Sequence, residues 1–249
     1  RRRCQAVSSL LGLIPARSGS KRLVGKNIKP LMGHPLLAYA IASALDSGVC
    51  QKVVVSTDSK AYADIARHYG AEVLMRPPEI ALDTSPDIAW LVAAIDAFPQ
   101  YDVAAIIRPT SPFRTAATIR RALGQWRERG REFDSLRAVA PCGEHAAKQW
   151  RIVGGLLIPV LLQPEPQPWH SSQKSTLPKL FTQTGGLEIM WTEMVRRTGT
   201  IAGERIMPFV VEGAEAHDIN VQEDWVVAEY LARENPAILP SVESVVLHE

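Results

Sequence analysis

Residues 14–27 read Ile-Pro-Ala-Arg-Ser-Gly-Ser-Lys-Arg-Leu-Val-Gly-Lys-Asn and join an apolar run at 10–14 to a helix-like segment at 36–45. Four cationic side chains and two glycines lie in this loop: Arg17, Lys21, Arg22, Lys26, Gly19 and Gly25. Glycines let backbone amides approach an anion closely, while arginine and lysine supply charged donors. A buried strand that runs into such a loop favours phosphate binding over a solvated basic turn.

The spacing of this loop excludes two common phosphate-binding motifs. A Walker A loop has four residues between its first glycine and a Gly-Lys pair, and serine or threonine follows. Here five residues separate Gly19 from Gly25, and Asn27 follows Lys26. The GxGxxG spacing of dinucleotide-binding folds is also absent from the sequence. The loop is therefore expected to bind phosphate outside both classes.

Length and charge narrow the class of protein. The 249 residues suit one large α/β domain with a small extension. The formal net charge is +2, which argues against a nucleic-acid partner, because such a partner requires a basic face across the domain. Cys4, Cys50 and Cys142 form no CxxC pair, so we expect reduced thiols in a cytoplasmic protein. No apolar run reaches the ~18 residues of a membrane span, so no membrane interaction is expected.

The two ends of the sequence are expected to be tails. Arg1-Arg2-Arg3 followed by an apolar segment imitates a signal peptide. We reject that interpretation because the apolar part is short and runs directly into the cationic loop. A single domain is expected at 7–235, with an extension at 140–190 and tails at 1–6 and 236–249.

Strands and helices alternate through the first half of the sequence. Apolar or β-branched runs predict strands at 10–14, 52–55, 72–75 and 103–107, and helical periodicity predicts helices at 36–45, 61–69, 86–95 and 116–129. This alternation indicates a mostly parallel, doubly wound α/β sheet. Ligands of such sheets bind outside the carboxyl ends of the strands, so the 15–27 loop, Asp58 and the 108–114 loop should converge.

The second half has a different character. Strands are expected at 135–139, 149–153, 187–191 and 206–211, a hairpin turn at Gly154-Gly155, and a helix at 221–231. Residues 163–178 are rich in proline, serine and glutamine. A segment of this length and composition is typical of a functional flap or an excursion toward a partner subunit.

Two further groups of residues are candidates for ligand binding. The 108–114 loop is stiffened by prolines and carries Thr110 and Ser111, which suit a base or a ribose; the alternative is an ordinary connection with Thr115 as helix cap. Asp218 and Asn220 point the same way in an extended segment, which suits Mg²⁺; the alternative is an acidic helix N-terminus. Asp58 is interpreted chiefly as a helix cap.

Six motifs, in order along nearly the whole sequence, resemble the acylneuraminate cytidylyltransferases, the family of the CMP-sialic acid synthetases. They are Ile-Pro-Ala-Arg-Ser-Gly-Ser-Lys at 14–21, Gly-Lys-Asn at 25–27, Val-Ser-Thr-Asp at 55–58, Arg-Pro-Pro-Glu at 76–79, Arg-Pro-Thr-Ser-Pro-Phe-Arg at 108–114 and Asp-Ile-Asn at 218–220. The first motif with its Lys-Asn ending is the most specific, and the resemblance weakens beyond residue 140. Relatives in this family act on legionaminic, pseudaminic and other nonulosonic acids.

The resemblance implies a Rossmann-like nucleotidyltransferase domain whose 140–190 extension carries part of the sugar site and reaches across a homodimer. The implied reaction joins CTP to a nonulosonic acid, giving a CMP-sugar and pyrophosphate with Mg²⁺ as cofactor. The implied catalytic residues are Arg17, Lys21 and Lys26. The implied nucleotide-binding residues are Ala16, Arg17, Ser18, Gly19, Lys26, Asn27, Arg76, Ser85, Asp87, Arg108, Thr110 and Ser111. The implied sugar-binding residues are Arg108, Lys148, Lys174, Gln183 and Thr184, and the implied metal ligands are Asp218 and Asn220.

The sequence departs from the family pattern mainly on the sugar side. Sialic acid enzymes commonly carry glutamine at Arg108, serine at Asp87, an Arg-Pro-Asn-Gly run at 182–185 and a second aspartate at Asn220. We therefore expect a nonulosonic acid other than plain sialic acid, or one with altered substituents. Two alternatives stay open: a 3-deoxy-manno-octulosonate or other sugar nucleotidyltransferase, and a catalytically silent paralogue that binds nucleotide.

Overall fold

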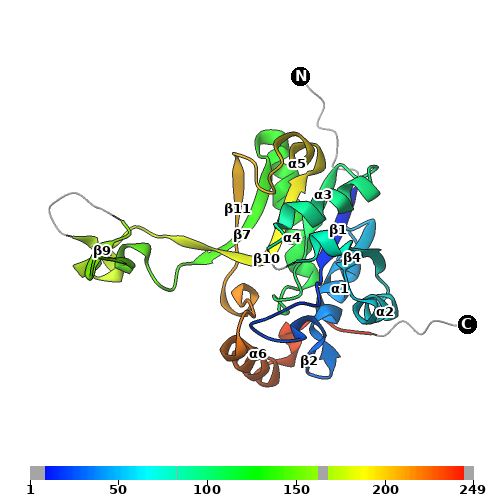
Figure 1. Cartoon of the computed structure of the whole chain (residues 1–249), viewed down its shortest axis with the longest axis horizontal. Coiled ribbons are helices and arrows are strands. Elements are labelled where there is room, and N and C mark those ends of the chain that lie inside the picture. Colours follow the sequence, from blue (N-terminus) through cyan, green and yellow to red (C-terminus); the bar gives the residue numbers. More distant parts are fainter. Residues whose placement is uncertain (1–8, 83, 162–167, 244–249) are drawn as a thin grey trace, which may run out of the picture.

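The protein is built on a seven-stranded sheet, seen in a computed structural model that describes residues 9–82, 84–161 and 168–243 (Figure 1). In spatial order the strands are β11 (Ile206–Val210), β7 (Ser135–Pro141), β10 (Phe181–Trp191), β6 (Val103–Ile106), β1 (Leu10–Pro15), β4 (Lys52–Thr57) and β5 (Glu72–Met75). All neighbouring pairs are parallel except those that involve β10. The prediction of a mostly parallel α/β sheet is confirmed.

Helices cover both faces of this sheet. They are α1 (Leu36–Asp46), α2 (Lys60–His68), α3 (Asp87–Ala97), α4 (Ala116–Arg129) and α5 (Thr192–Thr198), whereas α6 (Gln222–Glu234) packs in a separate cluster. Successive side chains of a strand point to opposite faces. In β1, Leu10 and Ile14 therefore pack with α1, α2 and α4, whereas Leu11 and Leu13 pack with α3 and α5. Because both faces are buried, the central strands read as continuous apolar runs.

A smaller apolar cluster packs α6 against a short two-stranded ribbon. Trp225 and Ala228 of α6 pack with Leu31, which belongs to the two-stranded ribbon of β2 (Pro30–Leu31) and β3 (His34–Pro35). Ile238, Leu239 and Val242 pack against the same cluster, so the tail expected from residue 236 begins later than predicted. The other expected tail, residues 1–6, lies outside the described residues.

Strand β10 differs most from the sequence prediction. It begins at Phe181, six residues before the expected start at 187, and its register against β7 shifts between Gln183 and Glu188. The polar and glycine-rich residues 182–186 lack the apolar signature of a strand, and pairing with β7 draws them into the sheet. Two glycines at a β-bulge are a common way to bend a strand near a functional site.

Beyond the sheet, β7 and β10 lead into an extension that projects from the body (Figure 1). Its end carries a hairpin of β8 (Trp150–Val153) and β9 (Leu156–Pro159), joined through Gly154 and Gly155 with φ of 58° and 79°. The hairpin and its turn are confirmed, because glycine adopts positive φ without strain. Of the proline-rich segment expected at 163–178, residues 163–167 lie outside the described part of the chain, and the rest forms short turns.

Short 3-10 helices occupy the connecting loops: η1 (Lys26–Ile28), η2 (Pro78–Ile80), η3 (Gly130–Glu132), η4 (Ala146–Lys148), η5 (Trp169–Ser171), η6 (Lys174–Thr176), η7 (Gly213–Ala216) and η8 (Pro236–Ile238). Within the described ranges, no helix combines the length and the apolar character that a bilayer crossing requires.

Candidate active site

A cleft of about 170 Å³ opens at the carboxyl ends of β1, β5 and β6. Strand β1 pairs with β4 on one side and with β6 on the other, so the chain order reverses beside β1. Parallel sheets bind ligands at such a switch point, because the loops that leave adjacent strands separate there. The cleft is lined by Pro15, Arg17, Ser20, Lys21, Arg22, Leu23, Lys26, Asn27, Arg76, Asp87, Arg108, Pro109, Thr110 and Asn220. The 15–27 and 108–114 loops therefore converge as predicted.

The lining of the cleft is strongly cationic. It contains six basic side chains, Arg17, Lys21, Arg22, Lys26, Arg76 and Arg108, against the single carboxylate of Asp87. Low-dielectric walls focus the field of charges of one sign. The cleft therefore suits a polyanion such as a nucleoside triphosphate, although the protein as a whole is almost neutral.

Asp58, at the end of β4, holds the cationic loop in place. Its two carboxylate oxygens each accept a hydrogen bond of 2.8 Å from Ser18, one from the backbone N–H and one from the hydroxyl. The cap of α2 is Ser59, whose hydroxyl accepts from the Tyr62 N–H, so the interpretation of Asp58 as the cap was wrong. On the other side of the loop, Asn27 donates from its side chain to the Arg17 carbonyl at 3.0 Å.

Lys26 is almost fully buried in the floor of the cleft. Its ammonium donates to the Ile219 carbonyl at 2.7 Å, which ties the cationic loop to the segment before α6. Burial lowers the pKa of Lys26 and the cations Arg22 and Arg17 act in the same direction, while the carboxylates of Asp218 and Asp224 oppose them. An arriving phosphate would add a negatively charged partner to this desolvated cation, so binding an anion here is favoured.

Arg76 forms the wall contributed by β5. Its Nε donates to the Ser56 hydroxyl at 2.8 Å, and its guanidinium lies 4.9 Å from the centroid of the Trp90 ring. Burial lowers the pKa of Arg76 to about 10, with Asp87 and Asp58 opposing the shift. The side chain therefore carries its charge at neutral pH, and its buried Nη2 has no hydrogen-bond partner in the described part of the structure.

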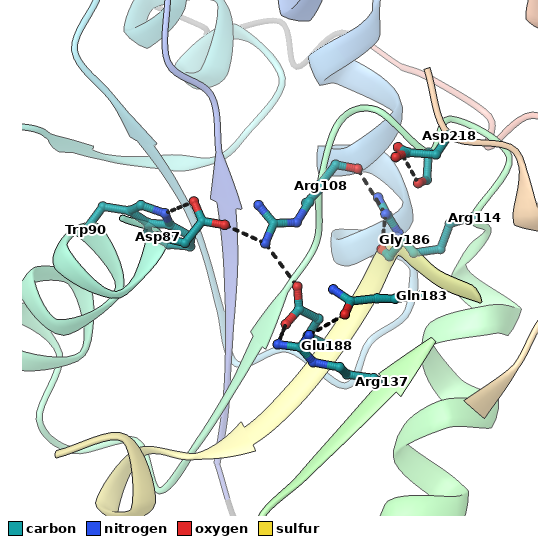
Figure 2. Close-up of polar contacts among 10 residues, drawn as sticks. Asp87, Trp90, Arg108, Arg114, Arg137, Gln183, Gly186, Glu188 and Asp218 are labelled. Atoms are coloured by element: carbon teal, nitrogen blue, oxygen red, sulfur yellow. Dashed lines mark hydrogen bonds and ion pairs between the residues drawn. The ribbon is translucent and has the colours of Figure 1, made fainter. Parts of the chain in front are cut away.

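Arg108 is held by a chain of ion pairs that begins at α3 and runs into the sheet (Figure 2). Its Nη2 contacts Asp87 at 2.8 Å and Glu188 at 3.0 Å, and Asp87 also accepts from the Trp90 indole N–H at 2.9 Å. Burial alone would lower the pKa of Arg108, but Glu188 and Asp87 outweigh it and raise the pKa. Burial likewise opposes ionisation of Asp87, yet Arg108 and the Trp90 N–H hold its pKa below the ordinary value.

The 108–114 loop owes its shape to a buried cation as well as to its prolines. The fully buried Arg114 donates to the Arg108 carbonyl at 3.0 Å and to the Gly186 carbonyl, so it connects this loop to the bulge of β10. Burial lowers the pKa of Arg114 to about 9, which leaves it charged at neutral pH. The Thr115 hydroxyl accepts from the Thr118 N–H at 3.4 Å, so Thr115 has the cap contact that the alternative interpretation of this loop gave it.

The two expected metal ligands lie together beside the cationic loop. The Asn220 side-chain amide donates to Asp218 at 2.9 Å, and Asn220 lines the cleft. Asp218 also accepts from the Ser111 hydroxyl at 3.4 Å. Asp224 caps α6 by accepting from the Asn220 and Val221 N–H groups, so the acidic helix start exists as well. Asp224 therefore provides the acidic helix start, and metal binding by Asp218 and Asn220 stays a prediction.

Not every residue expected at the nucleotide lines the main cleft. Ala16, Ser18, Gly19, Ser85 and Ser111 lie outside its lining, although Ser18 and Gly19 border a shallow adjoining pocket together with Lys21. Ala16 is buried, and Ser85 donates to the Glu79 carbonyl at 3.3 Å. Nucleotide contact stays a prediction for these five residues and for those that line the cleft.

The residues expected at the sugar are dispersed. Arg108 lines the cleft, Gln183 accepts a hydrogen bond from Arg137, and Thr184 is buried in the bulge of β10. Lys148 donates to the carbonyls of His170 and Ser172, and Lys174 donates to the Gly143 carbonyl, so both ammonium groups brace the extension. A sugar-binding role for either lysine requires the extension to reach the cleft of another copy.

Sequence reasoning missed Glu188 and Arg137, which complete the chain of ion pairs behind Arg108. The available signal was a lone glutamate in the otherwise apolar run Leu187-Glu-Ile-Met190. A glutamate is almost never fully buried unless it is paired. One of its cationic partners lies on β7 and the other in the loop after β6, so the sequence alone did not identify them.

Asp58→Ala should loosen the cationic loop. It removes two hydrogen bonds to a charged acceptor, and the loss of ~1.4 kcal/mol corresponds to roughly tenfold faster amide exchange across residues 16–22. Hydrogen–deuterium exchange measured by mass spectrometry checks this. The matched control is Asp64→Ala, which removes an exposed ion pair of α2 with Arg67 and should leave the loop unchanged. Equal protection of the loop in all three proteins would show that Asp58 does not hold it.

Comparison with known proteins identifies the family. Residues 11–150 match the family model described as Cytidylyltransferase. The chain is 33% identical over 238 residues, covering 92% of it and 99% of the relative, to a CMP-N,N'-diacetyllegionaminic acid synthase of Legionella pneumophila. It is also 44% identical over 112 residues to an N-acylneuraminate cytidylyltransferase of Escherichia coli, a match that covers 45% of this chain and 27% of that relative.

Solved structures show the same fold. A CMP:2-keto-3-deoxy-manno-octonic acid synthetase complexed with CTP superposes with a TM-score of 0.69 at 14% identity, covering 91% of this chain and 99% of that chain. A 4-diphosphocytidyl-2C-methyl-D-erythritol synthase from Anaerococcus prevotii gives a TM-score of 0.62 at 11% identity, covering 90% and 98%. With a cationic cleft at the switch point of the sheet and a family match across 11–150, the chain belongs to the cytidylyltransferase family, whose members are nucleotidyltransferases.

Proposed function

We propose that this protein couples CTP to a nonulosonic acid, giving a CMP-sugar and pyrophosphate. The carrying observation is the cationic cleft beside β1, where six basic side chains face one carboxylate. It lies in a chain that is 33% identical, over 92% of its length, to a relative named as a CMP-legionaminic acid synthase. The polyanion that the cleft suits is then the triphosphate of CTP.

The reaction needs positioning and charge neutralisation more than covalent chemistry. The anomeric hydroxyl oxygen of the sugar forms a bond to the α-phosphorus, the bond from that phosphorus to the bridging oxygen breaks, and the hydroxyl proton is lost to solvent. Pyrophosphate leaves with the electron pair of the broken bond. Arg17, Lys21 and Lys26, on the loop after β1, would offset the negative charge that builds on this leaving group.

The wall of the cleft that carries Arg108 supports a nonulosonic acid as the second substrate. Arg108 lines the cleft with 23% of its side chain exposed, and both of its internal ion pairs engage Nη2. A guanidinium has five N–H donors in a fixed fork, so donors on Nη1 and Nε are available to a sugar carboxylate. The departures from the sialic acid pattern at Asp87, Arg108 and 182–185 surround this wall, which favours a sugar other than plain sialic acid.

Incubation of the protein with CTP, Mg²⁺ and a panel of acids tests the function directly. The panel contains sialic, legionaminic and pseudaminic acids and 3-deoxy-manno-octulosonate, and release of pyrophosphate is measured. The expected result is faster turnover of one of the three nonulosonic acids than of 3-deoxy-manno-octulosonate. Preferred turnover of 3-deoxy-manno-octulosonate would replace the substrate class, and calorimetric CTP binding without any turnover would reduce the protein to a nucleotide-binding paralogue.

Arg17→Ala should lower kcat/KM. The fall should correspond to a loss of about 2–4 kcal/mol of transition-state stabilisation, as expected when one donor at a developing charge is removed. Steady-state kinetics with the preferred sugar measures the effect. Arg67→Ala is the matched control, because that exposed arginine pairs with Asp64 on α2, away from the cleft. Arg17 has no part in the reaction if both variants retain the parent kcat/KM.

Mg²⁺ is the cofactor that we propose for this reaction. Magnesium takes carboxylate and carbonyl oxygens with near-octahedral geometry and usually keeps waters and substrate phosphates as its other ligands. Asn220 lines the cleft and donates its side-chain amide to Asp218, and these two side chains are a small donor set that fits an ion arriving with the nucleotide. Among the described residues, no three His, Cys, Asp or Glu side chains converge as a complete metal site. When bound, the ion would neutralise phosphate charge.

Asp218→Asn should therefore raise the Mg²⁺ concentration for half-maximal activity by about tenfold, because it removes the negative ligand while preserving shape. Titration of activity with Mg²⁺ after chelation, together with calorimetry of Mg²⁺ binding to the CTP complex, measures the change. Asp224→Asn is the comparison, since Asp224 caps α6 and is not expected to bind the ion. Identical Mg²⁺ requirements in the parent and Asp218→Asn would remove Asp218 from the metal site.

A homodimer formed through the extension completes the proposal. The β8–β9 hairpin exposes apolar side chains that a lone chain would leave in water: Trp150, Ile152, Val153, Leu156 and Leu157, with Ile152 at 78% and Leu156 at 67% exposure. Contiguous exposed apolar patches mark interaction sites. A second copy is the occupant we favour, because Lys148 and Lys174 lie on the same extension and reach a cleft only in another copy. A cytoplasmic location, where CTP and reduced thiols are found, belongs to this proposal.

Leu156→Asp should convert the dimer into a monomer, because a buried unpaired charge at an interface costs several kcal/mol. Size-exclusion chromatography with light scattering measures the mass. Val226→Asp is the matched control, an exposed apolar residue of α6 at 55% exposure. A parent protein that is already monomeric, or a Leu156→Asp variant that stays dimeric, would rule out this hairpin as the interface.

A further inference from the structure

Glu188 is a buried carboxylate that links the wall of the cleft to the interior of the sheet. It lies on β10 directly opposite Ile106 of β6 and Arg137 of β7. Only 2% of its side chain is exposed, yet each carboxylate oxygen has a cation at 3.0 Å: Oε1 faces Arg108 and Oε2 faces Arg137. Of these three residues only Arg108 lines the cleft.

The arrangement fixes Arg108 from two sides (Figure 2). Asp87 and Glu188 both engage the same nitrogen, Nη2, and each of them has a second partner, Trp90 and Arg137 respectively. Arg137 is anchored in turn by Gln183. A flexible guanidinium is thus held in one orientation before any ligand arrives, which reduces the ordering cost of binding.

The bulge of β10 brings the same wall close to the metal ligands. A Cβ added to Gly185 would lie 3.3 Å from Arg108 Cδ and 3.3 Å from the Asp218 carboxylate. That spacing is tight, so the glycine permits the approach of both side chains to the strand. Three residues further along, Glu188 continues the contact with Arg108. β10 therefore shapes the wall that carries Arg108 without contributing to the cationic loop after β1.

Resting on the function proposed above, and assigning Arg108 to the sugar rather than to the nucleotide, we propose that Glu188 is a positioning residue for the acidic sugar: through Arg108 it sets how tightly the sugar is held, and it has no part in binding CTP. The distribution of contacts supports this division. The cationic loop is held by Asp58, Asn27 and the Ile219 carbonyl, whereas the ion pairs of the Glu188 carboxylate in the described part of the chain join it to Arg137 of β7 and Arg108 of the loop after β6.

Glu188→Gln should affect binding of the sugar and leave binding of CTP unchanged. It preserves shape but removes the charge that orients Arg108, so KM for the sugar should rise about tenfold while KM for CTP stays within about twofold and kcat within about threefold. The matched control is Asp96→Asn, which breaks an ion pair between α3 and α5 with Arg196 and should leave both KM values unchanged. An unchanged or lower sugar KM in Glu188→Gln would overturn the assignment, the lower value indicating that Glu188 merely repels the sugar.

A double-mutant cycle with Arg108→Ala shows whether Glu188 acts through Arg108. In the Arg108→Ala background, Glu188→Gln should change the sugar KM by less than about twofold, because groups acting as a unit are not additive. Effects that multiply would assign Glu188 a separate structural role and overturn the inference.

Burying an unpaired Arg137 is the main risk of the single variant. Glu188→Gln combined with Arg137→Gln removes both charges together, which is usually tolerated better than breaking a buried pair. This double variant should show the same rise in sugar KM, and a parent-like value would overturn the inference. A parent enzyme that turns over no acid refutes the proposed function as well, whereas parent turnover with a normal Glu188→Gln refutes the positioning role alone.

Discussion

Parallel pairing of β1 with β4 and β6 is the constraint on which the rest of the site depends. Pro15 pairs with Ser56, and Leu13 pairs with Ile106, so three chain segments leave the sheet at one level. Because the chain turns in opposite directions on the two sides of β1, the following loops part and leave a cleft. Cations that are far apart in the sequence, Arg17, Arg76 and Arg108, therefore face the same space.

Concentrating positive charge in a small cleft creates a problem that the protein solves with internal partners. Arg108 is held between Asp87 and Glu188, and Lys26 is bound by a backbone carbonyl. Without such partners, burial of these cations would destabilise the folded protein, because the cations would lose their hydration. Asp58 orders the cationic loop through a serine, because its two carboxylate oxygens accept from the N–H and the hydroxyl of Ser18.

The two halves of the site were predictable to different degrees. The loop at 14–27 and the strand before it could be predicted from the sequence, because an apolar run, glycines and cations follow one another in the chain. The wall around Arg108 did not. Residues 182–186 lie before the strand expected at 187–191, yet they form the bulged start of β10, and no role was predicted for Glu188. Asp58 was interpreted as a cap although its neighbour Ser59 has that role.

The sequence by itself determined the alternation of strands and helices, the cationic loop and the family, because each depends on residues adjacent in the chain or at a fixed periodicity. Only the tertiary structure decided which charges meet. The insertion of antiparallel β10 between β6 and β7 placed Glu188 between Arg108 and Arg137. Glu188 and Arg108 are 80 residues apart in the sequence, and they meet because of the order of the strands in the sheet. Sheet order is fixed by packing of the whole core, and no local pattern in one sequence encodes it.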